Sequence, residues 1–414
     1  MINIREVLNN KAVTGILLAL AAIPVFIYLF YVHKYAVNIP RQDDYDVMLG
    51  FMSRYKAATG SEKLSLLISQ HNEHRIAGSH LISVLYYSVF GAVNFRHLIF
   101  INGFMLLLSF GIIAYWIRKA MPQFWALVVL VLSLCMFDLN NAENMNFASS
   151  GMQHYGVLLL FAASMLLYAS GKKWTLPVAL LLQVLCIFSG NNGVLGAVVL
   201  VLFNLLQRNK PAIIASLAGL LAFVPLYYYQ NNGDGNSFYT LAPAKVLPYF
   251  LHIAGAHFSY TYGVYAALAI LAILLVVVPA GKKMTREMMP LLCVLLFVLG
   301  TIAGIAVFRG GLPLTSSYAG MYYIYAHLLV AFAFAFVLYE LRSRVFVSIL
   351  GLSVAGLLSV AYCYSTQDGI ALFAEYRNTL KTVDYDYPDK EKARQISEQA
   401  CSQGMYCIEQ HRLD

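Results

Sequence analysis

Long runs of apolar residues, separated by short polar segments, follow one another along almost the whole chain. A helix needs about 20 apolar residues to cross the hydrocarbon core of a bilayer, and the runs approach this length. The pattern therefore predicts an all-α integral membrane protein with about eleven transmembrane helices. These cover residues 12–32, 97–117, 122–137, 150–169, 174–189, 193–206, 211–229, 263–279, 290–307, 322–340 and 345–364.

Composition agrees with this pattern and excludes a water-soluble enzyme. Of the 414 residues, 60% are hydrophobic and 12% are charged, which is about half the charged share of a soluble domain. The formal net charge of +8 does not indicate a nucleic-acid partner, because basic residues recur in the short loops at every second connection. They are Arg5, Lys11, Arg118, Lys119, Lys172, Lys173, Arg208, Lys210, Lys282, Lys283, Arg286, Arg342 and Arg344.

The positive-inside rule places these short loops in the cytoplasm, so the N-terminus is predicted inside and the C-terminus outside. The predicted outer segments are longer and hold 17 of the 20 acidic residues. They are residues 33–96, 138–149, 230–262, 308–321 and 365–414. We expect the extracytoplasmic face to be the working face.

The domain organisation follows from the same pattern. Residues 1–364 are predicted to form one polytopic membrane domain, with interfacial helices in its first outer loop. Residues 365–414 are predicted to form a small extracytoplasmic tail, with one helix near Ile370 to Leu380 and a second after Pro388. Cys401 and Cys407 lie in this tail. In an oxidising compartment they could form a disulfide, although two free thiols are an equally simple interpretation.

The predicted spans carry almost no ionisable side chains. His154 and His327 are the exceptions. Ion-coupled transporters usually place charged groups near the middle of the bilayer. The scarcity of ionisable side chains in the predicted spans therefore favours an enzyme that acts on a lipid-linked substrate at the membrane surface.

An acidic motif follows the first predicted span. Asp43 and Asp44 stand directly before apolar residues at helical spacing, at the expected start of an interfacial helix. One carboxylate could cap this helix. Adjacent helical residues point in different directions, so capping does not account for both. The second carboxylate is a candidate general base for an acceptor hydroxyl.

A second amphipathic helix is predicted from Ser61 and ends in the sequence His71-Asn72-Glu73-His74-Arg75. His74 and Arg75 are candidates for contact with a lipid phosphate at the interface. His71 and His74 have the spacing of metal ligands, but no third ligand is evident and a solvated cluster is the simpler interpretation.

Two later outer segments carry further candidates. Glu143, Gln153 and His154 fall at the membrane edge, where carboxylate, amide and imidazole groups suit sugar hydroxyls. Arg309 is followed by two glycines, which would let a ligand approach the backbone closely. Its planar guanidinium fits phosphate oxygens, although an arginine at the end of a span can also simply snorkel. The Ser189–Gly193 segment is predicted to be a turn without a functional role.

Taken together, these features resemble the GT-C glycosyltransferases, which use polyprenyl-phosphate sugars outside the cytoplasmic membrane. The resemblance rests on the acidic pair after the first span, the interfacial helices, the arginine of the late loop, and the segments Phe90–Arg96 and Glu143-Asn144 with Gln153. Size and short tail are most similar to bacterial O-antigen glucosyltransferases of serotype-conversion clusters. One departure is Ser317 before Tyr318, where many relatives have arginine.

The resemblance implies a transferase that moves one hexose, such as glucose from undecaprenyl phosphate, to a glycan or lipid-linked O-antigen of lipopolysaccharide. It would act in the bacterial cytoplasmic (inner) membrane, facing the periplasm, among membrane lipids and without nucleic acid. The expected base is Asp44 or Asp43. Donor phosphate binding is assigned to Arg309, Arg75 and His74, and sugar or acceptor contact to Glu143, Gln153, His154 and Tyr318.

No cofactor is required by this scheme, and no residue is assigned to a metal. A divalent metal ion is compatible with it without being implied. Two other functions share the many spans and the basic loops: an O-antigen polymerase or ligase, and a flippase that transports lipid-linked sugar.

Overall fold

A computed structural model of the chain describes residues 10–72, 74–229, 238–258, 262–280, 285–343 and 346–408. Five residues named above, Arg5, Glu73, Lys282, Lys283 and Arg344, lie outside these ranges. The described chain is almost entirely helical, as predicted, and its strands are the two-residue pair β1 (Gln70–His71) and β2 (His74–Arg75).

Eight helical stretches are long and apolar enough to cross a membrane by length and composition. They are α2 (Lys11–Tyr35), α6 (Phe95–Ala120), α7 (Trp125–Met136) continued by η2 (Leu139–Asn141) and α8 (Ala142–Asn146), α9 (Ala148–Ala169), α12 (Lys210–Tyr228), η3 (Arg286–Met288) with α15 (Met289–Arg309), η5 (Gly320–Tyr322) with α16 (Tyr323–Glu340), and α17 (Val347–Thr382). The helices are those of a multi-pass membrane protein.

The remaining three predicted spans form shorter apolar helices. They are α10 (Thr175–Ile187), α11 (Asn191–Leu206) and α14 (Gly263–Ala280). The count of eleven spans therefore stays a prediction.

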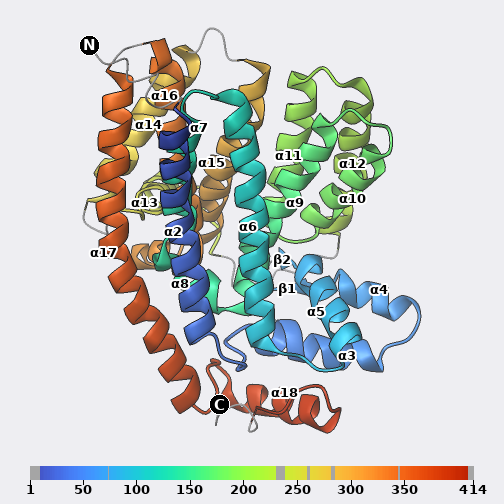
Figure 1. Cartoon of the computed structure of the whole chain (residues 1–414). Helices are drawn as coiled ribbons and strands as arrows, with labels where there is room; N and C mark the ends of the chain where they lie inside the picture. The colour runs from blue at the N-terminus through green and yellow to red at the C-terminus, as the bar shows by residue number, and fades with distance from the viewer. Residues whose placement is uncertain are drawn as a thin grey trace.

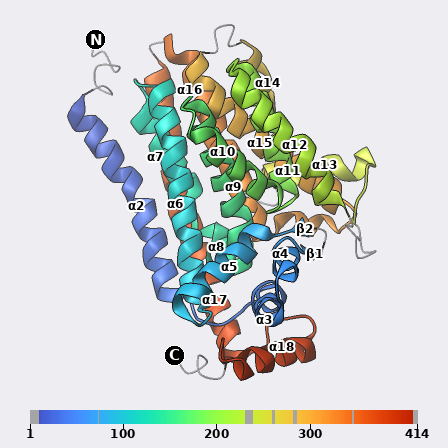
Figure 2. The same ribbon diagram turned by 90° about the vertical axis from the view of Figure 1, so that its right-hand side faces the viewer.

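The long helices pack side by side as a bundle (Figures 1 and 2). The stretches that contain α7 and α16 lie inside it. In the most apolar 18 residues of each, 89% and 78% of the residues are buried. By contrast, α2, α12 and α17 expose large apolar side chains such as Phe26, Leu221 and Leu357. Apolar surface of this extent on outer helices suits contact with lipid.

The polar connections at the two ends of the bundle differ in kind. At one end, Arg286 of η3 hydrogen-bonds to Gln207, and the Tyr339 hydroxyl accepts a hydrogen bond from Thr285 N. The other end carries the first loop, the β1–β2 hairpin and α18 (Lys390–Ser402), as Figure 1 shows. We call it the loop-rich end. The described basic loop residues thus lie away from the acidic motif, as the predicted topology requires.

The first loop is more elaborate than predicted. A π-helical turn, η1 (Tyr45–Gly50), leads into α3 (Phe51–Ala57), and α4 (Ser61–Leu67) begins at the predicted residue. However, the predicted helix does not continue to Arg75, because Asn72 adopts a positive φ of 49° and reverses the chain into the hairpin that pairs His71 with His74. An unpredicted helix, α5 (Ala77–Phe90), follows.

The tail also differs from the prediction at one point. The last predicted span and the first predicted tail helix form one continuous helix of 36 residues, α17, so the predicted boundary at residue 364 falls inside it. The second predicted tail helix is present as α18. We call residues 383–408 the C-terminal cap.

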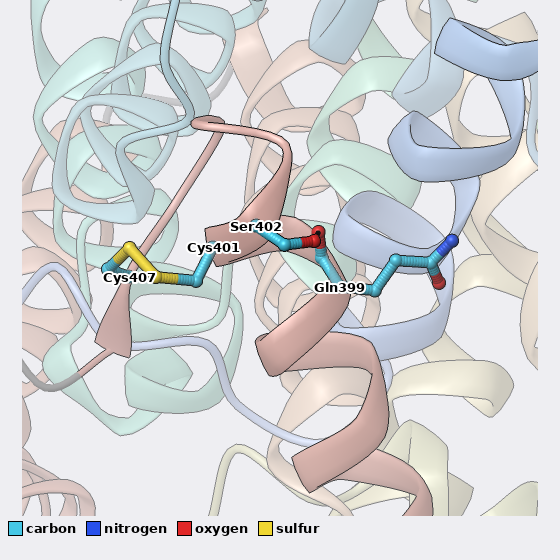
Figure 3. Close-up of a disulfide and its surroundings, with 4 residues drawn as sticks. All are labelled: Gln399, Cys401, Ser402 and Cys407. Carbon is cyan, nitrogen blue, oxygen red and sulfur yellow. Dashed lines mark hydrogen bonds between the residues drawn. A yellow bond between two sulfur atoms is a disulfide. The ribbon is translucent and has the colours of Figure 1, made fainter.

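The C-terminal cap holds both ends of the first loop. The Tyr406 hydroxyl donates to the carbonyl of Asn38 at 2.7 Å, and the Met405 carbonyl accepts from Val93 N at 2.9 Å. Cys401, in the last turn of α18, forms a disulfide with Cys407, which follows the helix, as Figure 3 shows. The disulfide alternative is therefore the one observed, and it closes the turn that presents Met405 and Tyr406.

Candidate functional site

A cavity of about 350 Å³ lies at the loop-rich end of the bundle. It is lined by residues from the first turns of α9, α11 and α16, the last turns of α12 and α15, and the β1–β2 hairpin. Four residues that the sequence singled out line it: His74, Gln153, His154 and Arg309. We call it the His154 cavity.

A chain of hydrogen bonds orients His154 in this cavity. Asn192 Nδ2 donates to the Tyr325 hydroxyl at 2.8 Å, and this hydroxyl lies 2.9 Å from Nδ1 of His154. The Tyr325 hydroxyl thus joins His154 of α9 to Asn192 of α11. The hydrogen bond at Nδ1 holds the ring in place, and His154 lines the cavity.

One wall of the cavity is a face of α15 with small side chains. Gly300, Thr301 and Gly304 line it at helical spacing, followed by Ile305, Phe308 and Arg309. A Cβ at Gly304 would meet no atom within 4 Å, so this position faces open space. The Thr301 hydroxyl is buried without a hydrogen-bond partner among the described residues. The wall is therefore mainly apolar up to the guanidinium at its end.

The segment between α10 and α11, together with the first turn of α11, supplies another part of the lining. Ser189, Gly190, Asn191 and Asn192 all line the cavity. A Cβ at Gly193 would lie 1.7 Å from the Cys186 carbonyl oxygen, so this tight turn needs glycine there. The sequence predicted a turn but no role, because the polar pattern alone does not show that the turn and the end of α15 line the same cavity.

Asp44 is the buried member of the acidic pair, with 1% of its surface exposed. Its Oδ1 accepts from Ser149 N at 2.8 Å and its Oδ2 accepts from Arg41 N at 3.2 Å. Burial raises the pKa of Asp44 to about 7, against the lowering effect of these hydrogen bonds. Asp44 occupies the N-cap position of η1 without capping it. It caps α9 instead, the helix that carries Gln153 and His154.

Asp43 has the opposite environment. Half of its side chain is exposed, and its Oδ1 lies 3.7 Å from Nε2 of His71. His71 faces His74 across the β1–β2 hairpin, and His74 lines the cavity. Asp43 therefore has an accessible carboxylate beside the hairpin, whereas both Asp44 oxygens already accept backbone hydrogen bonds.

Arg41 and Asp46, which stand on either side of Asp43 and Asp44, hold the acidic motif to the C-terminal cap. The Asp46 carboxylate accepts hydrogen bonds from the Tyr387 hydroxyl and from Lys392 Nζ. Although burial opposes it, these two bonds lower the pKa of Asp46. Arg41 forms an ion pair with Asp386 at 3.4 Å, and its guanidinium lies 4.0 Å from the ring centre of Tyr376. The motif is thus held from α9 on one side and from the cap on the other.

Arg75, predicted to bind phosphate, is placed differently from Arg309. Its Nε and Nη2 donate to the carbonyls of Tyr227 and Tyr229, at 2.8 and 2.7 Å. Its Nη1 donates to the carbonyl of Ile68 at 2.6 Å. Arg75 does not line the cavity. Its guanidinium joins the hairpin to the end of α12.

Glu143 and Tyr318 also lie away from the lining. Glu143 Oε2 accepts from Met321 N at 3.0 Å, which ties α8 to η5, the turn that leads into α16. The Tyr318 hydroxyl lies 3.2 Å from Nδ1 of His252 and joins η4 (Leu314–Tyr318) to α13 (Pro243–Ala254). In this structure both residues support the elements around the cavity, and their predicted contact with sugar stays a prediction.

The fold and the cavity together define a helical protein with the spans of a multi-pass membrane protein and a polar-rimmed cavity at one end. No family model matches the chain, and no curated protein matches it. Its function must be argued from the chemistry of the site.

Proposed function

We propose that this protein is a membrane glycosyltransferase that moves one hexose from a polyprenyl phosphate to a hydroxyl of a glycan acceptor. The observation that carries the proposal is the His154 cavity, which gathers His74 of β2, Gln153 and His154 of α9, and Arg309 of α15. A guanidinium beside an apolar wall suits a phosphate on a lipid chain. Amide and imidazole groups opposite it suit sugar hydroxyls.

The proposed reaction is a single displacement. Asp43 takes the proton from the acceptor hydroxyl, whose oxygen forms a bond to the anomeric carbon of the hexose. The bond between this carbon and the phosphate oxygen breaks, and polyprenyl phosphate leaves with the electron pair. Arg309 and His74 stabilise the negative charge that develops on the phosphate. Asp44 acts as a positioning residue, because it joins the acidic motif to α9.

The proposed location is a bacterial cytoplasmic membrane with the cavity facing the periplasm. Positive loops remain in the cytoplasm, and the described basic loop residues lie at the end opposite to the cavity. The donor is then a polyprenyl-phosphate sugar and the acceptor a glycan such as lipid-linked O-antigen. This scheme requires no cofactor.

The test is mass spectrometry of the surface polysaccharide of cells that express wild type or Asp43→Asn at equal membrane levels. We expect one hexose mass per repeat to be lost in the variant, with chain length unchanged. Altered chain length with unchanged repeats would instead indicate a polymerase or ligase. Transport of the lipid-linked sugar across vesicle membranes without its consumption would indicate a flippase.

A further inference from the structure

A second cluster of ionisable groups lies outside the His154 cavity. Asp138 follows α7, His257 follows α13, and His327 lies in the second turn of α16. One nitrogen or oxygen atom of each lies within 4.8 Å of the others. Within the described ranges this is the only place where three such side chains approach one another so closely.

The charge balance at this site is incomplete in the protein alone. Asp138 and His327 are 2% and 1% exposed. Across the described ranges, Asp138 has no ion pair with a lysine or an arginine; it accepts from Asn140 N at 2.9 Å and from the Ser365 hydroxyl at 2.8 Å. Burying a carboxylate is costly unless a positive charge lies close to it.

Both histidines bring a ring nitrogen near the Asp138 carboxylate. The rings of His257 and His327 meet edge to face, with centres 4.7 Å apart. Nδ1 of His257 is buried and has no hydrogen-bond partner in the described part of the chain. Nδ1 of His327 lies 3.1 Å from the Asn141 amide nitrogen, which fixes the orientation of the ring. Oδ1 of the same amide is buried without a hydrogen-bond partner among the described residues. With the amide turned so that Oδ1 accepts the Nδ1 hydrogen, Nε2 of His327 is left free to bind a metal.

We propose that Asp138, His257 and His327 bind one divalent transition-metal ion, with zinc as the best match. Two imidazoles and one carboxylate are a common zinc donor set, and water can complete the four ligands. The ion neutralises the buried carboxylate and gives the unpartnered His257 nitrogen a ligand role. It joins three segments that are distant in sequence, the end of α7, the segment after α13 and the start of α16.

The site stands behind the cavity and not in it. Tyr322 and Tyr325 of η5 and α16 line the cavity, whereas His327, two residues beyond Tyr325, does not. The metal therefore fixes the start of α16, and with it the Tyr325 hydroxyl that orients His154. The ion takes no part in the bond changes in the cavity and acts on them only through the position of Tyr325.

Metal content of the purified full-length protein in lipid nanodiscs tests this site. We expect about one zinc ion per chain after dialysis against buffer with micromolar ZnCl2. His257→Gln and Asp138→Asn should lower zinc affinity by about tenfold or more. His252→Gln is the matched control, because His252 lies nearby in α13 but contacts Tyr318. It should leave zinc content unchanged.

A second measurement separates loss of the site from loss of the fold. Cobalt(II) in place of zinc should give visible absorption bands of a tetrahedral site in wild type and His252→Gln. His257→Gln, still eluting as a monodisperse species, should lack them. The proposal is overturned if wild type binds neither ion, or if both ions bind equally well to His257→Gln and Asp138→Asn.

Discussion

Oδ1 of Asp44 accepts a hydrogen bond from the backbone N–H of Ser149 at 2.8 Å, and so joins the first loop to the start of α9. Four residues further along α9 are Gln153 and, one position later, His154, both in the cavity wall. Asp44, which in the sequence is one of two adjacent aspartates, thus helps to position the start of α9 and with it Gln153 and His154.

The two aspartates should respond differently to the same substitution. Asp43→Asn should lower hexose transfer by about 100-fold with the free energy of unfolding changed by less than about 0.5 kcal/mol, since its side chain is half exposed. Asp44→Asn leaves one of two buried N–H groups without an acceptor and should cost about 1–3 kcal/mol. Transfer assays and thermal unfolding in nanodiscs measure both. Equal loss of stability in the two variants would contradict this division of roles.

The pH dependence of stability should carry the signature of Asp44. Its pKa of about 7 in the folded protein lies above the ordinary value of 3.8. Between these two values the folded state holds a proton that the unfolded state releases, so stability falls as pH rises through this range. The melting temperature of wild type should therefore fall from pH 5 to pH 8 more steeply than that of Asp44→Asn. Parallel curves would show that Asp44 is already ionised at pH 5.

Filling the cavity should stop transfer without unfolding the protein. Gly304→Leu places a side chain in open space against the wall of α15, and we expect transfer to fall by about 100-fold because the donor sugar is displaced. Gly111→Leu is the matched control, since Gly111 also meets no atom within 4 Å but lies exposed on α6. Normal transfer by Gly304→Leu would place the donor elsewhere.

The two arginines should separate into a ligand contact and a structural contact. Binding of geranyl phosphate, measured against geraniol as the uncharged control, should weaken about tenfold or more in Arg309→Gln. Arg75→Gln should leave this binding unchanged in the folded fraction and lower stability by about 1.5–3 kcal/mol, because three backbone carbonyls lose their charged donor. The reverse pattern would assign the phosphate to Arg75.

The disulfide should protect the C-terminal cap. Cys401→Ser with Cys407→Ser opens a short loop that contributes about 2 kcal/mol, and hydrogen exchange at Val93, which donates to Met405, should become faster. Cys363→Ser, which removes an exposed free cysteine of α17, is the control. Unchanged exchange at Val93 in the double variant would mean that α18 holds this contact without the bridge.

The helical fold could be predicted largely from the sequence because apolar runs of sufficient length have few alternatives in a membrane. Local signals also placed the start of α4 at Ser61 and a helix after Pro388. The β1–β2 hairpin was not predictable from helical spacing, since it depends on the positive φ of Asn72 and on Arg75 reaching the end of α12.

The site was predictable only in part, for a similar reason. Residue type and position at a span end indicated His154 and Arg309. Nothing local distinguishes Asp43 from Asp44, because the difference is burial against α9. The role of Asn192 depends on Tyr325, a residue of another helix, and the proximity of Asp138 to His257 and His327 depends on the packing of three segments.

The length of helix α17 determines how far the C-terminal cap stands from the membrane. Its 36 residues extend for about 54 Å at 1.5 Å per residue, whereas the hydrocarbon core of a bilayer is about 30 Å thick. Its far end therefore lies outside the apolar layer. So do α18 and the two residues that hydrogen-bond to Asp46, Tyr387 and Lys392. The distance between the C-terminal cap and the lipid headgroups consequently depends on bilayer thickness. Lipids of different chain length would therefore change how far the acidic motif stands from the membrane surface.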